Sequence, residues 1–434
     1  MSSAGFTSPI ALSRRIPAGR SKAVARPGVP VVAGAAVVAL LPLIQPGGPA
    51  NSAPVDLLIG IALAAAVFWA VSSGQTWRFP YAFPVLLILT GGAIGAMAGT
   101  VPTAGATALA QDVVLLAWCW AVVNICRSAD SLKILVRTWA YSSLVWAGLL
   151  FVGLATGTSA LTGRTPTFGS RTMLTFGDPN VAANYLVISI MIIWATQCPR
   201  RRAPRLAGYA LLLAALATTG SNSGIVGIIV AVTVAAVLGV YVRAGTVPAV
   251  TMLCFLVLGG YLVATNVHLS RIQERAQASR YAFLRDGIGR EESSVASRGS
   301  ILHESVRLYR EGGPLGAGPG STKPRLEAKQ APVVKEAHDD YLAALNERGI
   351  LGLVGLVLLL GGVTWRALTL ARRPLSRDFS AIVARPNAIV GAIAATMVAM
   401  AVVELLHVRH VWTLFAFVAA LSLWGREWHE AGPP

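Results

Sequence analysis

The feature that most constrains this chain is a series of apolar stretches, each close to the length that crosses a lipid bilayer. An α-helix needs about 20 mostly apolar residues for this, because the hydrocarbon core is about 30 Å thick and a helix rises about 1.5 Å per residue. The stretches lie at residues 29–45, 55–73, 81–99, 109–126, 139–157, 181–197, 206–219, 224–242, 247–266, 349–365, 388–407 and 411–425. We therefore expect an all-α, polytopic membrane protein with about 12 transmembrane helices.

The charge content agrees with this class. Of the 434 residues, 13% are charged and 55% are hydrophobic, whereas a soluble domain carries about 25% charged residues. The chain has 36 Lys and Arg against 19 Asp and Glu. Most of the basic residues lie in short connections between apolar stretches, and no basic stripe with interleaved aromatic residues appears. We therefore expect membrane lipids and no nucleic acid among the partners.

The distribution of basic residues predicts the orientation of the chain. The connections at 46–54, 100–108 and 219–223 contain no Lys or Arg. The alternate connections carry Arg78, then Arg127, Lys133 and Arg137, then Arg200, Arg201, Arg202 and Arg205, then Arg243, then Arg366, Arg372, Arg373, Arg377 and Arg385. Because basic connections stay in the cytoplasm, the first set is expected outside.

This orientation divides the chain into five parts. They are a basic cytoplasmic segment (1–28), nine transmembrane helices (29–266), a long extracytoplasmic loop carrying short helices (267–340), three further transmembrane helices (341–425) and a cytoplasmic tail (426–434). The composition, rich in Ala, Val and Arg, is typical of a bacterium with GC-rich DNA. The expected location is the bacterial plasma membrane.

Polar side chains gather at the expected outer ends of the apolar stretches. They are Asp56, Asp112, Asp178, Asn180, Asn184, Asn222, His338, Asp339, Asp340, Glu347, Glu404 and His407. Glu404 and His407 are expected three residues apart on one helix face. Polar groups in a membrane are costly and usually functional, so the pattern predicts a water-accessible cavity open to the outside.

Four short motifs occur in an order that is similar to one membrane family. They are Phe176-Gly177-Asp178-Pro179-Asn180 with Arg171 upstream, Thr219-Gly220-Ser221-Asn222-Ser223-Gly224, Arg298 before Pro314-Leu315-Gly316-Ala317-Gly318-Pro319-Gly320, and His338-Asp339-Asp340-Tyr341-Leu342 followed by Glu347 and Gly349. Over roughly residues 160–365, they resemble motifs of the O-antigen ligase and polymerase superfamily.

The resemblance implies an enzyme and assigns roles to residues. Members are mostly membrane glycosyltransferases that move a glycan from a polyprenyl-pyrophosphate lipid to an acceptor hydroxyl at the outer face, without a metal ion or another cofactor. It implies that His338 is the base. Arg171 and Arg298 would bind the pyrophosphate, because a planar guanidinium binds phosphate bidentately. Further substrate-binding candidates are Arg164, Asn180, Asn222, Asp340 and Glu347.

One departure from the family pattern leaves alternatives open. Asn222 stands where the family usually has arginine. Either Arg164 supplies the missing cation, or the donor headgroup is bound differently, or the chain is a non-catalytic component of a polysaccharide assembly complex. A transporter of a small anion is a further alternative. Ligase and polymerase activity, the sugar and the acceptor also stay open.

Overall fold

The computed structural model of the protein describes residues 28–45, 52–99, 101–266, 274–280, 285, 303–311, 313–330 and 339–425. These residues form helices and no strand, as expected for the all-α class. The main elements are α1 (Gly28–Ala39), α2 (Pro54–Ser73), α3 (Ala82–Ala98), α4 (Pro102–Ile125), α5 (Ala129–Thr156), α6 (Ser159–Thr162), η2 (Pro166–Phe168), α7 (Pro179–Thr196), α8 (Arg202–Thr218), α9 (Asn222–Ala244), α10 (Thr246–Asn266), α14 (Thr322–Ala328), α15 (Asp340–Arg372), α16 (Arg377–Ser380), α17 (Pro386–Met400) and α18 (Arg409–Trp424).

The helices have the properties of a membrane bundle. Within the described ranges, six helices are long and apolar enough to cross a bilayer: α2, α4, α5, α7, α9 and α15. Large apolar side chains also lie exposed on the outside of the bundle, such as Phe68 and Met97, as a lipid-facing surface requires. Each expected apolar stretch overlaps a helix, although the one expected at 29–45 ends at Ala39, so the polytopic helical class is confirmed. The number of crossings, about 12, stays a prediction.

The most buried part of the bundle lies around α7 and α18. Trp139 on α5 stacks on Tyr185 of α7 with ring centroids 5.8 Å apart and also contacts Phe417 of α18. The indole nitrogen of Trp139 donates to Ser189 Oγ at 2.9 Å, so this buried polar group is satisfied. These contacts make α7 and α18 the buried centre of the bundle, against which other helices pack.

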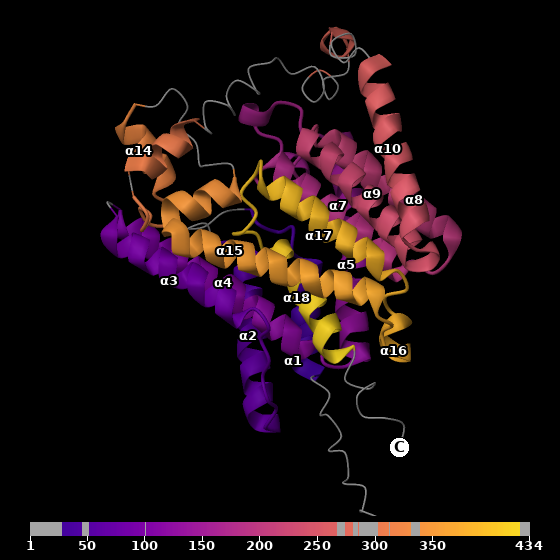
Figure 1. Ribbon diagram of the computed structural model, residues 1–434, viewed down its shortest axis with the longest axis horizontal. Coiled ribbons are helices and arrows are strands. Elements are labelled where there is room, and N and C mark those ends of the chain that lie inside the picture. The colour runs from indigo at the N-terminus through magenta and orange to yellow at the C-terminus, as the bar shows by residue number, and fades with distance from the viewer. Residues whose placement is uncertain are drawn as a thin grey trace, which may run out of the picture.

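Close packing of α3 against α15 sets the position of the first turns of α15. A Cβ atom on Gly91 would lie 2.5 Å from the carbonyl oxygen of Arg348, and one on Gly95 would lie 2.5 Å from that of Glu347. Small residues at this spacing let two helix backbones approach closely. Figure 1 shows α14 and the start of α15 at one end of the bundle and α16 at the opposite end.

The expected helix ending at residue 407 is shorter than predicted. Helix α17 ends at Met400, and Glu404 and His407 lie in the connection to α18, so their expected placement on one helix face is wrong. The backbone amides of Leu405 and Leu406 instead donate to the carboxylate of Asp340, at 2.6 and 3.0 Å. Because these amides have a side-chain acceptor, the chain satisfies them without continuing the helix.

Candidate functional site

A cavity of about 550 Å³ lies where the expected outer ends of five segments meet. Its wall comes from the start of α2, the first half of α4, the region around α14, the start of α15 and the connection between α17 and α18. The polar lining residues are Ser52, Asp56, Thr107, Gln111, Asp112, Lys323, Asp340, Glu347, Arg348, Glu404, His407 and Arg409. The structure therefore gathers in one cavity many of the polar groups that the sequence placed separately at helix ends.

Two adjacent aspartates build the start of α15. Asp339 caps the helix, and its Oδ1 accepts hydrogen bonds from the amides of Tyr341 and Leu342 at 2.8 and 3.1 Å. Burial raises the pKa of Asp339, and these two amides partly offset that rise. Asp340 lies 3% exposed and holds the connection between α17 and α18 through Leu405 and Leu406. The helix start that the sequence predicted here is confirmed.

Helix α15 is interrupted by Gly349, where a glycine-rich segment docks against it. Gly349 has φ 67° and ψ −168°, a left-handed conformation that favours glycine. The segment 314–320, called the glycine loop below, fills the break. The amide of Ile350 donates to Pro314 O, and that of Gly318 donates to Glu347 O, both at 2.9 Å. The loop thus replaces hydrogen bonds that the broken helix lacks.

The Glu347 side chain fastens the far end of the glycine loop. Its Oε2 accepts from the amide of Gly320 at 2.9 Å, and its Oε1 accepts from the hydroxyl of Thr322 at 2.7 Å and from that residue's amide at 3.3 Å. Asp340 and Glu347 therefore each hold a neighbouring segment through backbone donors. The described geometry gives both carboxylates a positioning role in the cavity wall.

Two ion pairs join distant parts of the chain across the cavity. Arg348 donates to Asp112 Oδ2 at 2.6 Å, and both side chains are about one-tenth exposed. Arg409 binds Asp56 bidentately, with its Nε 2.8 Å from Oδ1 and its Nη2 donating to Oδ2. Planar guanidinium–carboxylate pairs of this kind fix geometry as well as charge. They fasten α15 to α4 and α18 to α2.

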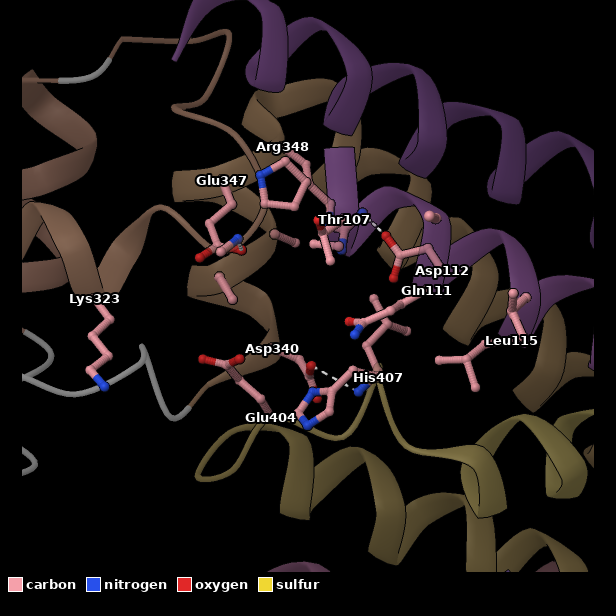
Figure 2. A pocket seen from close by; sticks show the side chains of 18 of the residues that line it. Thr107, Gln111, Asp112, Leu115, Lys323, Asp340, Glu347, Arg348, Glu404 and His407 are labelled. Atoms are coloured by element: carbon pink, nitrogen blue, oxygen red, sulfur yellow. Dashed lines mark hydrogen bonds and ion pairs between the residues drawn. The ribbon is translucent and has the colours of Figure 1, made fainter. Parts of the chain in front are cut away.

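The remaining lining groups suit the recognition of hydroxyl groups. Thr107, Gln111 and His407 supply a hydroxyl, an amide and an imidazole, which both donate and accept hydrogen bonds. In Figure 2, the side chains of Gln111, Glu404 and His407 point into the space between α4, α15 and the connection before α18. Sugars present many hydroxyl groups, so such a lining fits a glycan.

A second polar cluster surrounds Arg171, which is 5% exposed. Its Nε donates to Thr219 O at 2.8 Å and its Nη2 to Asn180 Oδ1 at 3.4 Å. Ser221 Oγ also donates to Asn180 Oδ1, at 2.8 Å. The structure thus brings together Arg171, the Gly-Asp-Pro-Asn motif and the turn before α9. The described lining of the cavity does not include Arg171.

Two helices begin at this cluster. Asp178 caps α7 by accepting from the amides of Asn180 and Val181, and Ser221 caps α9 by accepting from Gly224. The partial positive charge of a helix N-terminus favours anions. The start of α7 at the Asp-Pro-Asn motif is as the sequence predicted.

The other predicted site residues differ in how far the structure describes them. His338 and Arg298 lie outside the described residues. Arg164 and Asn222 are exposed, and Asn222 is the first residue of α9. The sequence reasoning missed Arg348, Arg409, Lys323 and Gln111 as cavity residues. One signal was present for Arg348, since it directly follows Glu347 in the motif that carries the resemblance.

Comparison with known proteins gives one family. The family model described as O-Antigen ligase matches residues 207–357. This range contains the glycine loop, the start of α15 and its break, together with Arg298 and His338; Arg171 and Asn180 precede it. No curated protein matches the chain.

Proposed function

This chain belongs to the O-antigen ligase family, and we propose that it transfers or polymerises glycan from a polyprenyl-pyrophosphate donor onto an acceptor hydroxyl at the extracytoplasmic face. The family supports a membrane protein with a glycan-transfer function, in general a multi-pass protein of the bacterial inner membrane. The observation that carries the finer proposal is the cavity of about 550 Å³ lined with hydroxyl-binding groups, formed partly by the family-matched residues.

The proposed reaction is a displacement at the sugar carbon attached to the pyrophosphate. The acceptor oxygen forms the new carbon–oxygen bond, the bond to the pyrophosphate oxygen breaks, and the acceptor proton passes to His338. The polyprenyl pyrophosphate leaves with the bonding electron pair. His338 directly precedes the helix cap Asp339 in the sequence. No metal ion takes part in this proposal.

Arg171 and Arg298 are proposed to stabilise the negative charge on the leaving pyrophosphate. The surroundings of Arg171 support this role. Its Nε and Nη2 donate to the oxygens of Thr219 and Asn180, which fix the orientation of the guanidinium beside the turn before α9. The N-terminus of α9, which the neutral Ser221 caps, adds partial positive charge nearby.

The transport alternative predicts polar groups that continue along a path to the opposite end of the bundle. Buried polar side chains deeper in the bundle pair with each other within the packed core. Trp118 donates to Thr413 at 2.9 Å, and Asn184 hydrogen-bonds the fully buried His410 at 2.9 Å. This arrangement favours transfer chemistry at one face over transport.

Glycan transfer in vesicles with a purified lipid-linked donor tests the proposal. His338→Ala is expected to lower turnover by ~10² to 10⁴, the usual contribution of a general base, and Arg298→Ala is expected to lower it as well. His303→Ala and Arg243→Ala are matched controls, because both residues are exposed and lie outside the cavity lining. Turnover like that of the wild type in both His338→Ala and Arg298→Ala would contradict the proposal.

A further inference from the structure

A second, smaller cavity lies at the opposite end of the bundle. It has a volume of about 220 Å³ and is lined by Val136, Arg137, Tyr141, Thr196, Cys198, Arg200, Ala381 and Ile382. These residues come from α5, from the end of α7 and the turn after it, and from the segment after α16. Helix α17 starts beside this cavity and ends near the large one, and its 15 residues span about 22 Å.

Two guanidinium groups in the wall of this cavity have no acidic partner. Within the described part of the chain, neither Arg137 nor Arg200 forms an ion pair, and the lining contains no carboxylate. Asp130 at the start of α5 and Asp378 on α16 belong to the same end of the bundle but do not line the cavity. The cavity is therefore positively charged.

The remaining polar groups suit an oxyanion with several oxygen atoms. Tyr141 contributes a phenolic hydroxyl, which hydrogen-bonds with the neighbouring Cys198 side chain and can also reach a ligand in the cavity. Two guanidinium groups and a hydroxyl are the donors that bind phosphate in proteins, since each guanidinium offers parallel N–H groups to two phosphate oxygens. Phosphate is thus the group that fits the charge and the donor set.

The position on the bundle identifies the source of that phosphate. Arg200 belongs to a basic connection that also contains Arg201, Arg202 and Arg205, and basic connections mark the cytoplasmic side. Anionic phospholipids are abundant in that leaflet and bind basic pockets between transmembrane helices. A lipid headgroup therefore has access to the cavity from the membrane surface.

A largely apolar stripe on α5 starts before the cavity residues, passes them and continues along the helix. Ile134, Tyr141, Val145 and Val152 recur at intervals of seven, four and seven residues, which places them on one helix face. All four side chains are about half exposed. Such a stripe gives the acyl chains of a lipid a surface to lie against.

We propose that this cavity binds the phosphate group of an anionic phospholipid, with Arg137 and Arg200 as its ligands and the acyl chains along the exposed stripe of α5. The site is separate from the glycan-transfer site and does not depend on the activity proposed above. The same donors bind free phosphate, so the test must distinguish the two sources.

Native mass spectrometry of the full-length protein in neutral detergent provides the test. The probes are phosphatidylglycerol, the zwitterionic phosphatidylcholine, and inorganic phosphate as competitor. Arg137→Gln and Arg200→Gln are each expected to weaken phosphatidylglycerol binding about fivefold, and the double variant about 25-fold, because each direct ion pair with the phosphate contributes about 1 kcal/mol. Arg243→Gln removes the same charge from the exposed end of α9, where it makes no contact with the site, and is expected to change binding less than about twofold.

The outcomes separate the possible sources. If inorganic phosphate does not displace phosphatidylglycerol, the result supports a lipid site. If inorganic phosphate displaces it efficiently, the cavity binds the phosphate group alone and the lipid proposal is overturned. Equal loss in Arg137→Gln and Arg243→Gln would show diffuse attraction by the basic surface and would overturn the site. So would equal affinity of the double variant and the wild type. Because Arg137 and Arg200 are partly or fully exposed, unchanged melting temperatures are expected to show that the variants fold.

Discussion

The two ends of this bundle use arginine in opposite ways. At the large cavity, Arg348 and Arg409 each bind an aspartate, and the pairs fasten helices that are distant in the sequence. At the small cavity, Arg137 and Arg200 face a space whose lining has no carboxylate. A paired guanidinium fixes structure, whereas one without a carboxylate keeps its charge for a ligand. We therefore expect the paired arginines to stabilise the fold at the large cavity and the arginines of the small cavity to bind a ligand.

The largest expected effect comes from breaking the pair at the large cavity. Arg348→Ala leaves the Asp112 carboxylate in a poorly solvated position without its partner, at a cost of about 3 kcal/mol. The melting temperature in detergent is then expected to fall by roughly 5 °C. The double variant Asp112→Asn/Arg348→Met removes both charges and is expected to recover part of this loss. An unchanged melting temperature for Arg348→Ala would contradict a structural role for the pair.

The break in α15 gives the next effect. Gly349→Ala places a Cβ atom 2.3 Å from Pro314 O in a left-handed conformation, which costs about 2 kcal/mol. Gly361→Ala is the matched control, because no heavy atom lies within 4 Å of its added Cβ. In the middle of a helix, that change is neutral or stabilising. Thermal unfolding measures both, and equal effects would show that the glycine loop does not need Gly349.

A smaller and more local effect is expected at Asp340. Asp340→Asn removes the charge that attracts the amides of Leu405 and Leu406, which costs about 1.5 kcal/mol. Hydrogen exchange of residues 401–408, measured by mass spectrometry, is expected to become roughly tenfold faster. Asp378→Asn on α16 is the control, since Asp378 is exposed. If exchange in the connection stays unchanged, Asp340 does not hold it.

The smallest effect on stability is expected at the other end of the bundle. Arg137→Gln should change the free energy of unfolding by less than about 0.5 kcal/mol, because no carboxylate there loses a partner. Thermal unfolding without added lipid measures this. A loss as large as that of Arg348→Ala would remove the contrast between the two ends.

Local patterns in the sequence predicted the helices and several of their first residues. The apolar stretches overlap helices, and α7 and α15 begin where Asp178 and Asp339 indicated. Both aspartates stand directly before the helix whose first amides they accept. Such features depend on neighbours in the chain, so the sequence alone reveals them.

Contacts between distant segments could not be predicted in this way. Asp112 and Arg348 are 236 residues apart, and Asp56 and Arg409 are 353 apart. Nothing near either residue of a pair indicates its partner. The same limit explains why the predicted end of α17 was wrong. The acceptor for the Leu405 and Leu406 amides is Asp340, which lies on another helix. The roles of His338 and Arg298 stay predictions.

The break at Gly349 also bears on how the protein responds to the lipid around it. Membrane segments tilt when bilayer thickness changes, and an unbroken α15 would carry that tilt directly to Asp340 and Glu347. Here the two parts of the helix meet at Gly349, and the part before it is held by the glycine loop and by α4. The geometry of the cavity is therefore expected to be insulated from the thickness of the host membrane.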